Sequence, residues 1–245
     1  MAGATLAADE VARFDALAAR WWEPDGPMRP LHRMNPARIG WTVARVRERF
    51  ADRPEGLAGL RLLDVGCGAG IAAEALARLG FDVLGLDAAA APIAAAVAHA
   101  KGRVGEAGLA LAYRVGVAED LLAEGATFPV VTALEVVEHV PDPAAFLRVL
   151  AGLVAPGGLL VLSTLNRTAA SFVAAKVVAE YALRWLPVGT HDWRRFLTPA
   201  ELSRHVRDAG LAVGDVAGLA PDLVRGGWRV GRDLRVNYLL AATRA

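Results

Sequence analysis

The chain contains the stretch Leu62-Leu63-Asp64-Val65-Gly66-Cys67-Gly68-Ala69-Gly70, in which apolar residues lead into three glycines at alternate positions. The apolar residues predict a buried strand, and the alanine-rich residues that follow predict a helix. Glycines at such a turn let a ligand approach the backbone, and the start of the helix offers it free N–H groups. The stretch therefore predicts a cofactor site at the carboxyl edge of a parallel sheet.

Outward from this stretch, short apolar strands alternate with helices. The predicted strands span residues 60–65, 81–86, 109–115, 128–134 and 158–164, and the predicted helices span residues 69–79, 92–106 and 143–154. This alternation is typical of βαβ crossovers, which place helices on both faces of a mostly parallel sheet. We therefore expect an α/β fold with a doubly wound, Rossmann-like sheet.

The two flanks of this core are predicted to be largely helical. One helix is expected within residues 6–22, and a second opens at Asn35-Pro36 and runs to Phe50. After the fifth strand, residues 168–186 predict an inserted helix, 198–209 a helix capped by Thr198, and 211–218 and 236–242 two closing strands. We expect one domain, made of a helical cap (1–59), a cofactor-binding core (60–164), a helical insertion (165–197) and a C-terminal part (198–245).

Acidic residues near the glycine loop indicate the kind of cofactor. Asp87 ends the second strand, about 20 residues after the loop, where a carboxylate can accept both hydroxyls of a ribose. Glu119 and Asp120 follow the third strand and are placed to flank an adenine ring. Because Asp64 would repel a pyrophosphate, its charge favours a cationic cofactor, and we predict S-adenosylmethionine. The alternative is a glycine turn that only packs a helix on a strand.

The loop differs from the pattern of nicotinamide enzymes. Its glycines follow G-x-G-x-G, and Ile71 stands where G-x-G-x-x-G has its third glycine. The spacing therefore argues against a dehydrogenase. Cys67 has no histidine near it in sequence to act as its base, so we expect a small buried side chain without a chemical role.

A second group of polar residues, Glu135, Glu138 and His139, follows the fourth strand. Side chains at positions i, i+3 and i+4 converge if this stretch forms a helical turn. Two carboxylates and an imidazole suit a divalent ion such as Mg²⁺ with positions open for substrate oxygens. Three roles remain open: these residues bind a metal, or His139 is a general base without a metal, or the group is architectural.

Composition excludes several other classes of protein. The chain has 245 residues, with 27 basic against 26 acidic side chains, which argues against a nucleic-acid-binding role. Every apolar run of spanning length contains a charge, and the first ten residues carry two acids and no base, so neither a membrane-spanning helix nor a signal peptide is expected. A single cysteine excludes an internal disulfide and favours the cytoplasm.

With these motifs, the chain resembles the class I S-adenosylmethionine-dependent methyltransferases. More narrowly, it resembles the ubiquinone-biosynthesis O-methyltransferases, through residues 20–22, 30–38, 135–143, 163–167 and 189–192. The resemblance implies methylation of catechol hydroxyls in polyprenylated ubiquinone precursors, at two steps. It also implies cofactor contacts for Arg38, Gly66, Asp87 and Leu134, beside those expected for Asp64, Gly68 and Gly70. In related enzymes the Glu-x-x-Glu-His pattern holds magnesium, which Glu135, Glu138 and His139 match.

Two other functions stay open. The chain could be a small-molecule methyltransferase for another phenolic or quinone acceptor, or a non-catalytic protein that binds S-adenosylmethionine. A polyprenyl substrate must be met at a membrane, and in residues 168–186 the only charges, Lys176, Glu180 and Arg184, recur every four residues. This helix is expected either to pack as core or to lie on the inner face of the membrane. Association with other proteins of the pathway is left open.

Overall fold

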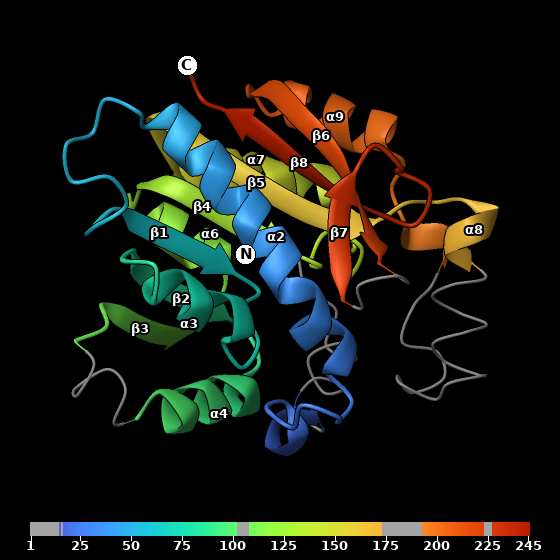
Figure 1. Ribbon diagram of the computed structural model, residues 1–245. Helices are drawn as coiled ribbons and strands as arrows, with labels where there is room; N and C mark the ends of the chain where they lie inside the picture. Colours follow the sequence, from blue (N-terminus) through green and yellow to red (C-terminus); the bar gives the residue numbers. More distant parts are fainter. Residues whose placement is uncertain (1–14, 16, 102–107, 173–192, 223–226) are drawn as a thin grey trace.

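The fold centres on an eight-stranded sheet with the strand order β3-β2-β1-β4-β5-β8-β6-β7 (Figure 1). The structure is a computed structural model, and it describes residues 15, 17–101, 108–172, 193–222 and 227–245. Its strands are β1 (Arg61–Val65), β2 (Asp82–Asp87), β3 (Leu111–Val115), β4 (Phe128–Leu134), β5 (Val154–Leu165), β6 (Ala212–Pro221), β7 (Trp228–Gly231) and β8 (Asn237–Thr243). Strands β1 to β5 pair in parallel, whereas β8, β6 and β7 add antiparallel pairs.

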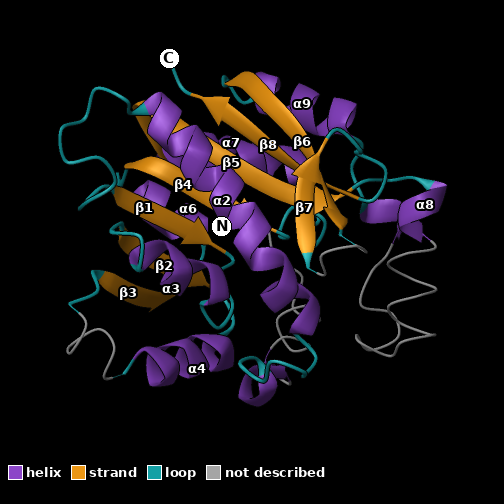
Figure 2. Cartoon of the chain, viewed as in Figure 1, coloured by secondary structure: helices purple, strands orange, loops and turns teal. Residues whose placement is uncertain are grey.

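Helices cover both faces of the sheet, which confirms the doubly wound prediction (Figure 2). The helices α2 (Arg29–Arg49), α3 (Ile71–Ala77) and α4 (Ala90–Ala100) pack on one face. The helices α6 (Ala118–Ala123), α7 (Pro143–Leu153) and α9 (Pro199–Asp208) pack on the other. Three short pieces complete the described helices: η1 (Ala18–Arg20), α8 (Ala169–Ser171) and η3 (Trp193–Arg195).

Two layers of apolar side chains hold these faces together. Successive strand residues point to opposite sides, so Leu62 packs under α2 and α3 while Leu63 packs under α7. The strand order reverses between β1 and β4, because β2 lies on one side of β1 and β4 on the other. Ligands bind at such a switch point, beyond the carboxyl ends of the strands.

The second helix of the cap ends near Phe50 as predicted, but its start was predicted incorrectly. It begins at Arg29, with Pro30 in its first turn, so Asn35 and Pro36 lie inside it and Asn35 caps nothing. The Asn35 amide Nδ2 instead donates to the carbonyl of Ile71 at 3.0 Å. An Asn-Pro pair is typical of a helix start, but here tertiary contacts hold a proline within the helix although it contributes no N–H.

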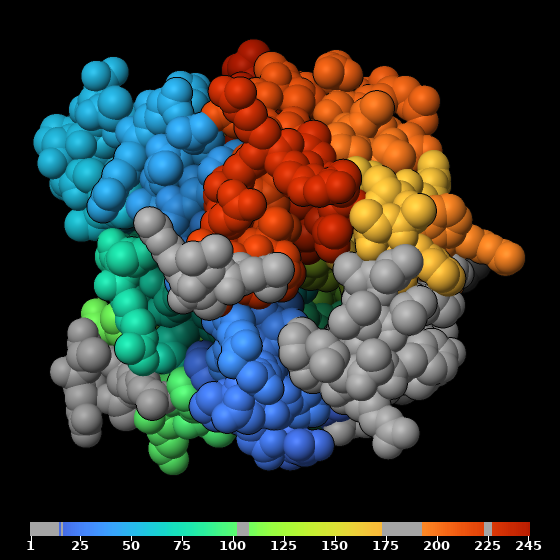
Figure 3. Space-filling view, turned by 45° about the vertical axis from the view of Figure 1, so that its right-hand side comes forward, coloured from blue at the N-terminus to red at the C-terminus, as the bar shows by residue number. Residues whose placement is uncertain are grey.

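Three other elements also differ from prediction. Strand β7 and helix α6 were not expected, and β5 begins at Val154, directly after α7. The β6–β7 hairpin packs on α2 (Figure 3). Met34 of α2 packs there against Leu219 of β6 and Leu239 of β8. Four-residue strands such as β7 give too short an alternation to recognise in sequence.

The predicted inserted helix is described only at its start. Thr168 caps α8 by accepting a hydrogen bond from the Ser171 N–H at 3.1 Å. Residues 173–192 lie outside the described part. The same holds for residues 1–14 and 16, which include much of the predicted helix within 6–22, and for residues 102–107, which include the end of the predicted helix 92–106. Among the helices in the described ranges, none is both long and apolar enough to cross a bilayer.

Candidate cofactor and catalytic site

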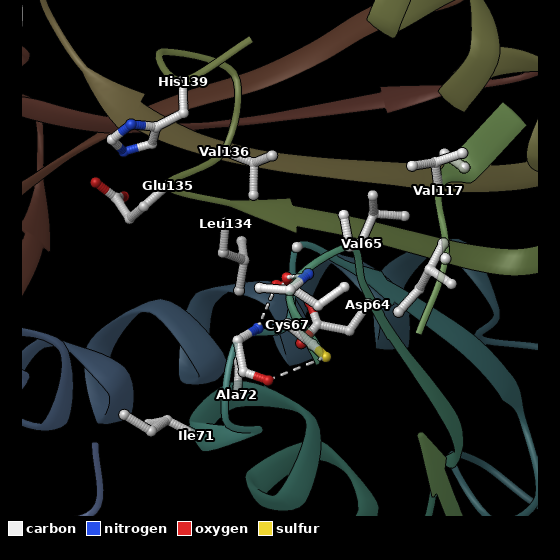
Figure 4. A pocket seen from close by; sticks show the side chains of 18 of the residues that line it. Asp64, Val65, Cys67, Ile71, Ala72, Val117, Leu134, Glu135, Val136 and His139 are labelled. Atoms are coloured by element: carbon white, nitrogen blue, oxygen red, sulfur yellow. Dashed lines mark hydrogen bonds between the residues drawn. The ribbon is translucent and has the colours of Figure 1, made fainter. Parts of the chain in front are cut away.

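A pocket of about 1060 Å³, including its part open to solvent, lies at the carboxyl ends of β1, β2 and β4 (Figure 4). Most of the predicted site residues line it, namely Arg38, Asp64, Gly66, Gly68, Asp87, Glu119, Leu134, Glu135 and His139. The residues predicted for the site but absent from the lining are Gly70, Asp120 and Glu138.

The glycine loop needs glycine at both positions that line the pocket. Gly66 and Gly68 have φ angles of +69° and +54°, which side chains rarely adopt. A Cβ at Gly66 would lie 2.5 Å from a methyl of Val136, and one at Gly68 would lie 2.4 Å from the Trp21 ring. Gly70 is needed for packing instead, because a Cβ there would lie 2.2 Å from the hydroxyl of Tyr113.

Asp87 fastens the loop from the end of β2. Its Oδ2 accepts from the Gly68 N–H at 2.8 Å, and its Oδ1 accepts from the Ala89 N–H at 2.9 Å. Burial raises the pKa of Asp87, and the two backbone hydrogen bonds oppose that rise. Each carboxylate oxygen keeps a second lone pair, so Asp87 can still accept hydroxyl groups from the pocket.

Asp64 and Arg38 are both buried at the pocket wall, where their opposite charges influence each other. Thr132 donates its hydroxyl to Asp64 Oδ1 at 2.7 Å, while Oδ2 has no hydrogen-bond partner among the described residues. Burial raises the pKa of Asp64 to about 6, although the Arg38 guanidinium and the Thr132 hydrogen bond oppose it. Arg38 Nε donates to Asn35 Oδ1 at 2.9 Å, and burial lowers its pKa.

Of the two acidic residues after β3, Glu119 lines the pocket and Asp120 does not. Glu119 lines the pocket, as expected for a residue beside an adenine ring. Asp120 instead accepts from the Val117 N–H at 3.4 Å and so closes the first turn of α6. Adjacent residues at a helix start point in different directions, which is why only one of the two faces the pocket.

Apart from Arg38, the pocket residues that the N-terminal cap provides were not predicted from the sequence. Trp21 and Leu31 line the pocket, and the Trp22 indole donates to the carbonyl of Ala69 at 2.9 Å. Val136, which follows β4, and Phe146 of α7 complete the apolar lining. Single apolar residues carry no chemical signature, and the one available signal was the Arg20-Trp21-Trp22 stretch.

The helical turn that would bring Glu135, Glu138 and His139 together does not form. Glu135 has a φ of +62°, and only residues 137–139 form a turn, so the three side chains do not share a helical face. Glu135 Oε1 accepts from the Ser163 hydroxyl at 2.6 Å, and Oε2 accepts from Asn237 Nδ2 at 3.0 Å. Glu138 is buried and does not line the pocket; its Oε2 accepts from the Thr164 hydroxyl at 2.8 Å.

This arrangement does not fit a magnesium ion. Within the described ranges, no group of three or more His, Cys, Asp and Glu side chains is arranged to hold a metal. Both oxygens of Glu135 already accept hydrogen bonds from neutral donors. Burial raises the pKa of Glu138, the nearby Glu135 raises it further, and His139 opposes the rise. Of the three predicted metal ligands, Glu135 and His139 line the pocket and Glu138 does not (Figure 4).

A switch-point pocket with a glycine loop and strand-end acids defines the class of S-adenosylmethionine-dependent methyltransferases. Comparisons agree: a family model described as a methyltransferase domain matches residues 37–216. In fold, the chain is similar to the magnesium protoporphyrin IX methyltransferase of Synechocystis PCC 6803, solved with bound S-adenosylmethionine. The TM-score is 0.64 over 99% of this chain and 100% of the other, at 20% identity, which shows the fold alone.

Sequence relatives narrow the class. The ubiquinone biosynthesis O-methyltransferase of Azorhizobium caulinodans is 49% identical over 98% of this chain and 94% of its own length. The protein of the same name from Methylobacterium nodulans is 50% identical over 99% of this chain and 97% of its own. The chain belongs to the ubiquinone biosynthesis O-methyltransferases.

Proposed function

We propose that this enzyme transfers the methyl group of S-adenosylmethionine to catechol hydroxyls of polyprenylated ubiquinone precursors, at both O-methylation steps of the pathway. The observation that carries the proposal is a single pocket with Asp64 and Asp87 at the glycine loop and Glu135 with His139 on its wall. The names of the relatives support the same reaction.

The residues at the loop fit the cofactor. Asp87 would hold the ribose hydroxyls, and Glu119 would lie beside the adenine. Arg38 would hold the carboxylate of the methionine part, because a guanidinium pairs with a carboxylate through two bonds. The unpartnered Oδ2 of Asp64 would accept the ammonium, which compensates its buried charge. When bound, S-adenosylmethionine supplies a methyl group activated by its sulfonium sulfur.

The acceptor needs a base. A phenol with a pKa of about 10 is mostly protonated at neutral pH and is a poor nucleophile in that form. His139 lines the pocket and would remove the proton of the hydroxyl as its oxygen attacks the methyl carbon in line with sulfur. The apolar lining of Trp21, Leu31 and Phe146 would keep water from competing.

The metal alternative has a direct test. We expect enzyme treated with EDTA to keep its rate, with no gain on adding Mg²⁺, because His139 serves as base in the arrangement described. A rate that falls with EDTA and returns with Mg²⁺ would instead support a loop rearrangement that brings Glu138 to Glu135 and His139.

We also propose that residues 168–186 bring the enzyme to the inner face of the membrane. The charges of Lys176, Glu180 and Arg184 would share one stripe of a helix, and the remainder is mostly apolar. Wild-type protein is expected to co-sediment with anionic lipid vesicles. The double change Phe172→Asp with Val173→Asp should abolish sedimentation and keep cofactor binding.

A matched control is Val97→Asp on α4, which also places an acid at an exposed apolar position. It should sediment like the wild type. Wild-type protein that stays in the supernatant with vesicles of several compositions would contradict the membrane proposal.

The biological step is tested by mass spectrometry of quinone intermediates in cells that lack this protein. We expect polyprenylated catechols without the methyl group of either O-methylation step to accumulate. Normal ubiquinone in such cells would favour another phenolic or quinone acceptor, or a protein that only binds S-adenosylmethionine.

A further inference from the structure

Glu135 has an unusual backbone for a residue with a side chain. Its φ of +62° places it in the left-handed region, and it is the one non-glycine residue in the described part of the chain to do so. Such conformations persist where surrounding contacts hold them, and they cluster at functional sites. The contacts that hold Glu135 in this conformation therefore bear on the function of the pocket.

Two neighbouring strands hold it, through three hydrogen bonds. Its N–H donates to the carbonyl of Ser163 at 2.9 Å, and Ser163 Oγ donates back to Oε1 at 2.6 Å. Asn237 Nδ2 donates to Oε2 at 3.0 Å. Ser163 lies on β5 and Asn237 begins β8, and these strands pair directly. Both side chains are buried, so the donors are fixed by the sheet itself.

Packing alone does not account for Asn237. Its amide Oδ1 is buried without a hydrogen-bond partner among the described residues. A buried polar atom without a partner lowers stability, and an apolar side chain of similar size would avoid that cost. The hydrogen bond that Asn237 does make is aimed at a carboxylate on the pocket wall.

We propose that Ser163 and Asn237 are positioning residues that orient the Glu135 carboxylate toward the catechol. The inference rests on the proposed function and deepens it. A catechol has two adjacent hydroxyls, and when one faces His139 the other needs an acceptor. Each Glu135 oxygen uses one lone pair on its donor and keeps another for this second hydroxyl. A carboxylate held in one orientation selects one pose of the ring, whereas a rotating carboxylate would admit several.

The test uses single changes at both donors, measured on a soluble catechol. Ser163→Ala and Asn237→Ala should each lower kcat about tenfold, the effect of losing one hydrogen bond to a charged group, while KM for S-adenosylmethionine stays unchanged. Asn237→Asp should be worse than Asn237→Ala although it keeps the shape, because it sets a second carboxylate against Glu135.

The matched control is Tyr238→Phe on the same strand. It removes one buried hydrogen bond, from the Tyr238 hydroxyl to the carbonyl of Leu197 at 2.9 Å, and touches no pocket residue by that bond. It should keep the wild-type kcat. S-adenosylhomocysteine binding confirms that each variant is folded, and Ser163→Ala provides a second route if Asn237 variants fail to fold.

A double-mutant cycle decides whether the donors act through Glu135. In a Glu135→Ala background, adding Asn237→Ala or Ser163→Ala should lower the residual rate no further. Wild-type kcat in both single variants, or an equal loss in both backgrounds, would overturn the inference. Wild-type enzyme that methylates no catechol would contradict the proposed function instead.

Discussion

Asp87 connects the glycine loop to the proposed ribose site through one carboxylate. It already accepts from the backbone at Gly68 and Ala89, so its oxygens are fixed where ribose hydroxyls would arrive. Each hydrogen bond to a charged group is worth roughly 1.5–3 kcal/mol. Asp87→Ala should therefore weaken the binding of S-adenosylhomocysteine more than tenfold in calorimetry.

The control for this change is Asp82→Ala, which removes an exposed acid from the other end of the same strand. Its dissociation constant should equal that of the wild type. An unchanged constant in Asp87→Ala would remove Asp87 from the cofactor site.

Asp64 predicts a stability that depends on pH. Its pKa is raised from 3.8 to about 6 in the folded protein, so the fold favours the protonated form. The stabilisation is complete below the unfolded pKa and is lost as the pH rises through about 6. Asp64→Asn lacks that loss. Without cofactor at pH 7.5, its free energy of unfolding from urea titrations should therefore exceed that of the wild type by roughly 2–3 kcal/mol.

Near pH 4 the two proteins should approach each other in free energy of unfolding. The same variant should bind S-adenosylmethionine more weakly, because the ammonium loses its carboxylate. A difference in stability that is constant with pH would contradict the raised pKa.

Helix α2 carries Arg38 into the pocket. Arg38 is buried and held by Asn35 one turn earlier, and the Asn35 amide also reaches the carbonyl of Ile71 at the start of α3. Lysine cannot copy the two-pronged bond of a guanidinium to a carboxylate. Arg38→Lys should therefore raise KM for S-adenosylmethionine more than it changes kcat, in steady-state assays.

Arg45→Lys on the same helix is the matched change, because Arg45 pairs with Glu48 and Asp215 at the surface. Its KM should stay at the wild-type value. Loss of thermal stability in Arg38→Lys without a kinetic change would assign Arg38 a structural role.

The elements also show what the sequence could and could not predict. Strands β1, β2 and β4 and the glycine loop follow from local patterns, so the sheet edge was predicted correctly. Asp64, Asp87 and Glu135 line the pocket at this edge. The start of α2 was missed because a local Asn-Pro signal lost to tertiary packing.

The geometry after β4 could not be predicted for a different reason. The backbone of Glu135 is set by Ser163 and Asn237, which lie 28 and 102 residues away in sequence. A helical turn was the local expectation, and long-range hydrogen bonds replaced it. Trp21 and Leu31 were missed as pocket residues because the cap reaches the loop only in the folded chain.

In the whole molecule, three parts of the fold meet at one pocket. The parallel half, β1 to β4, carries most of the residues proposed to hold the cofactor, and β8 supplies the Asn237 donor to Glu135. The cap closes the third side with α2. The relatives likewise match this chain over nearly its full length and not only over the cofactor-binding core.

The central claim is that this pocket transfers a methyl group to a catechol oxygen. The most direct measurement incubates the purified enzyme with S-adenosylmethionine carrying a deuterated methyl group and a soluble prenylated catechol, followed by mass spectrometry. We predict one labelled methyl group on a catechol oxygen, with S-adenosylhomocysteine formed in equal amount. Binding of S-adenosylmethionine without any labelled product, or a label on ring carbon, would contradict the claim.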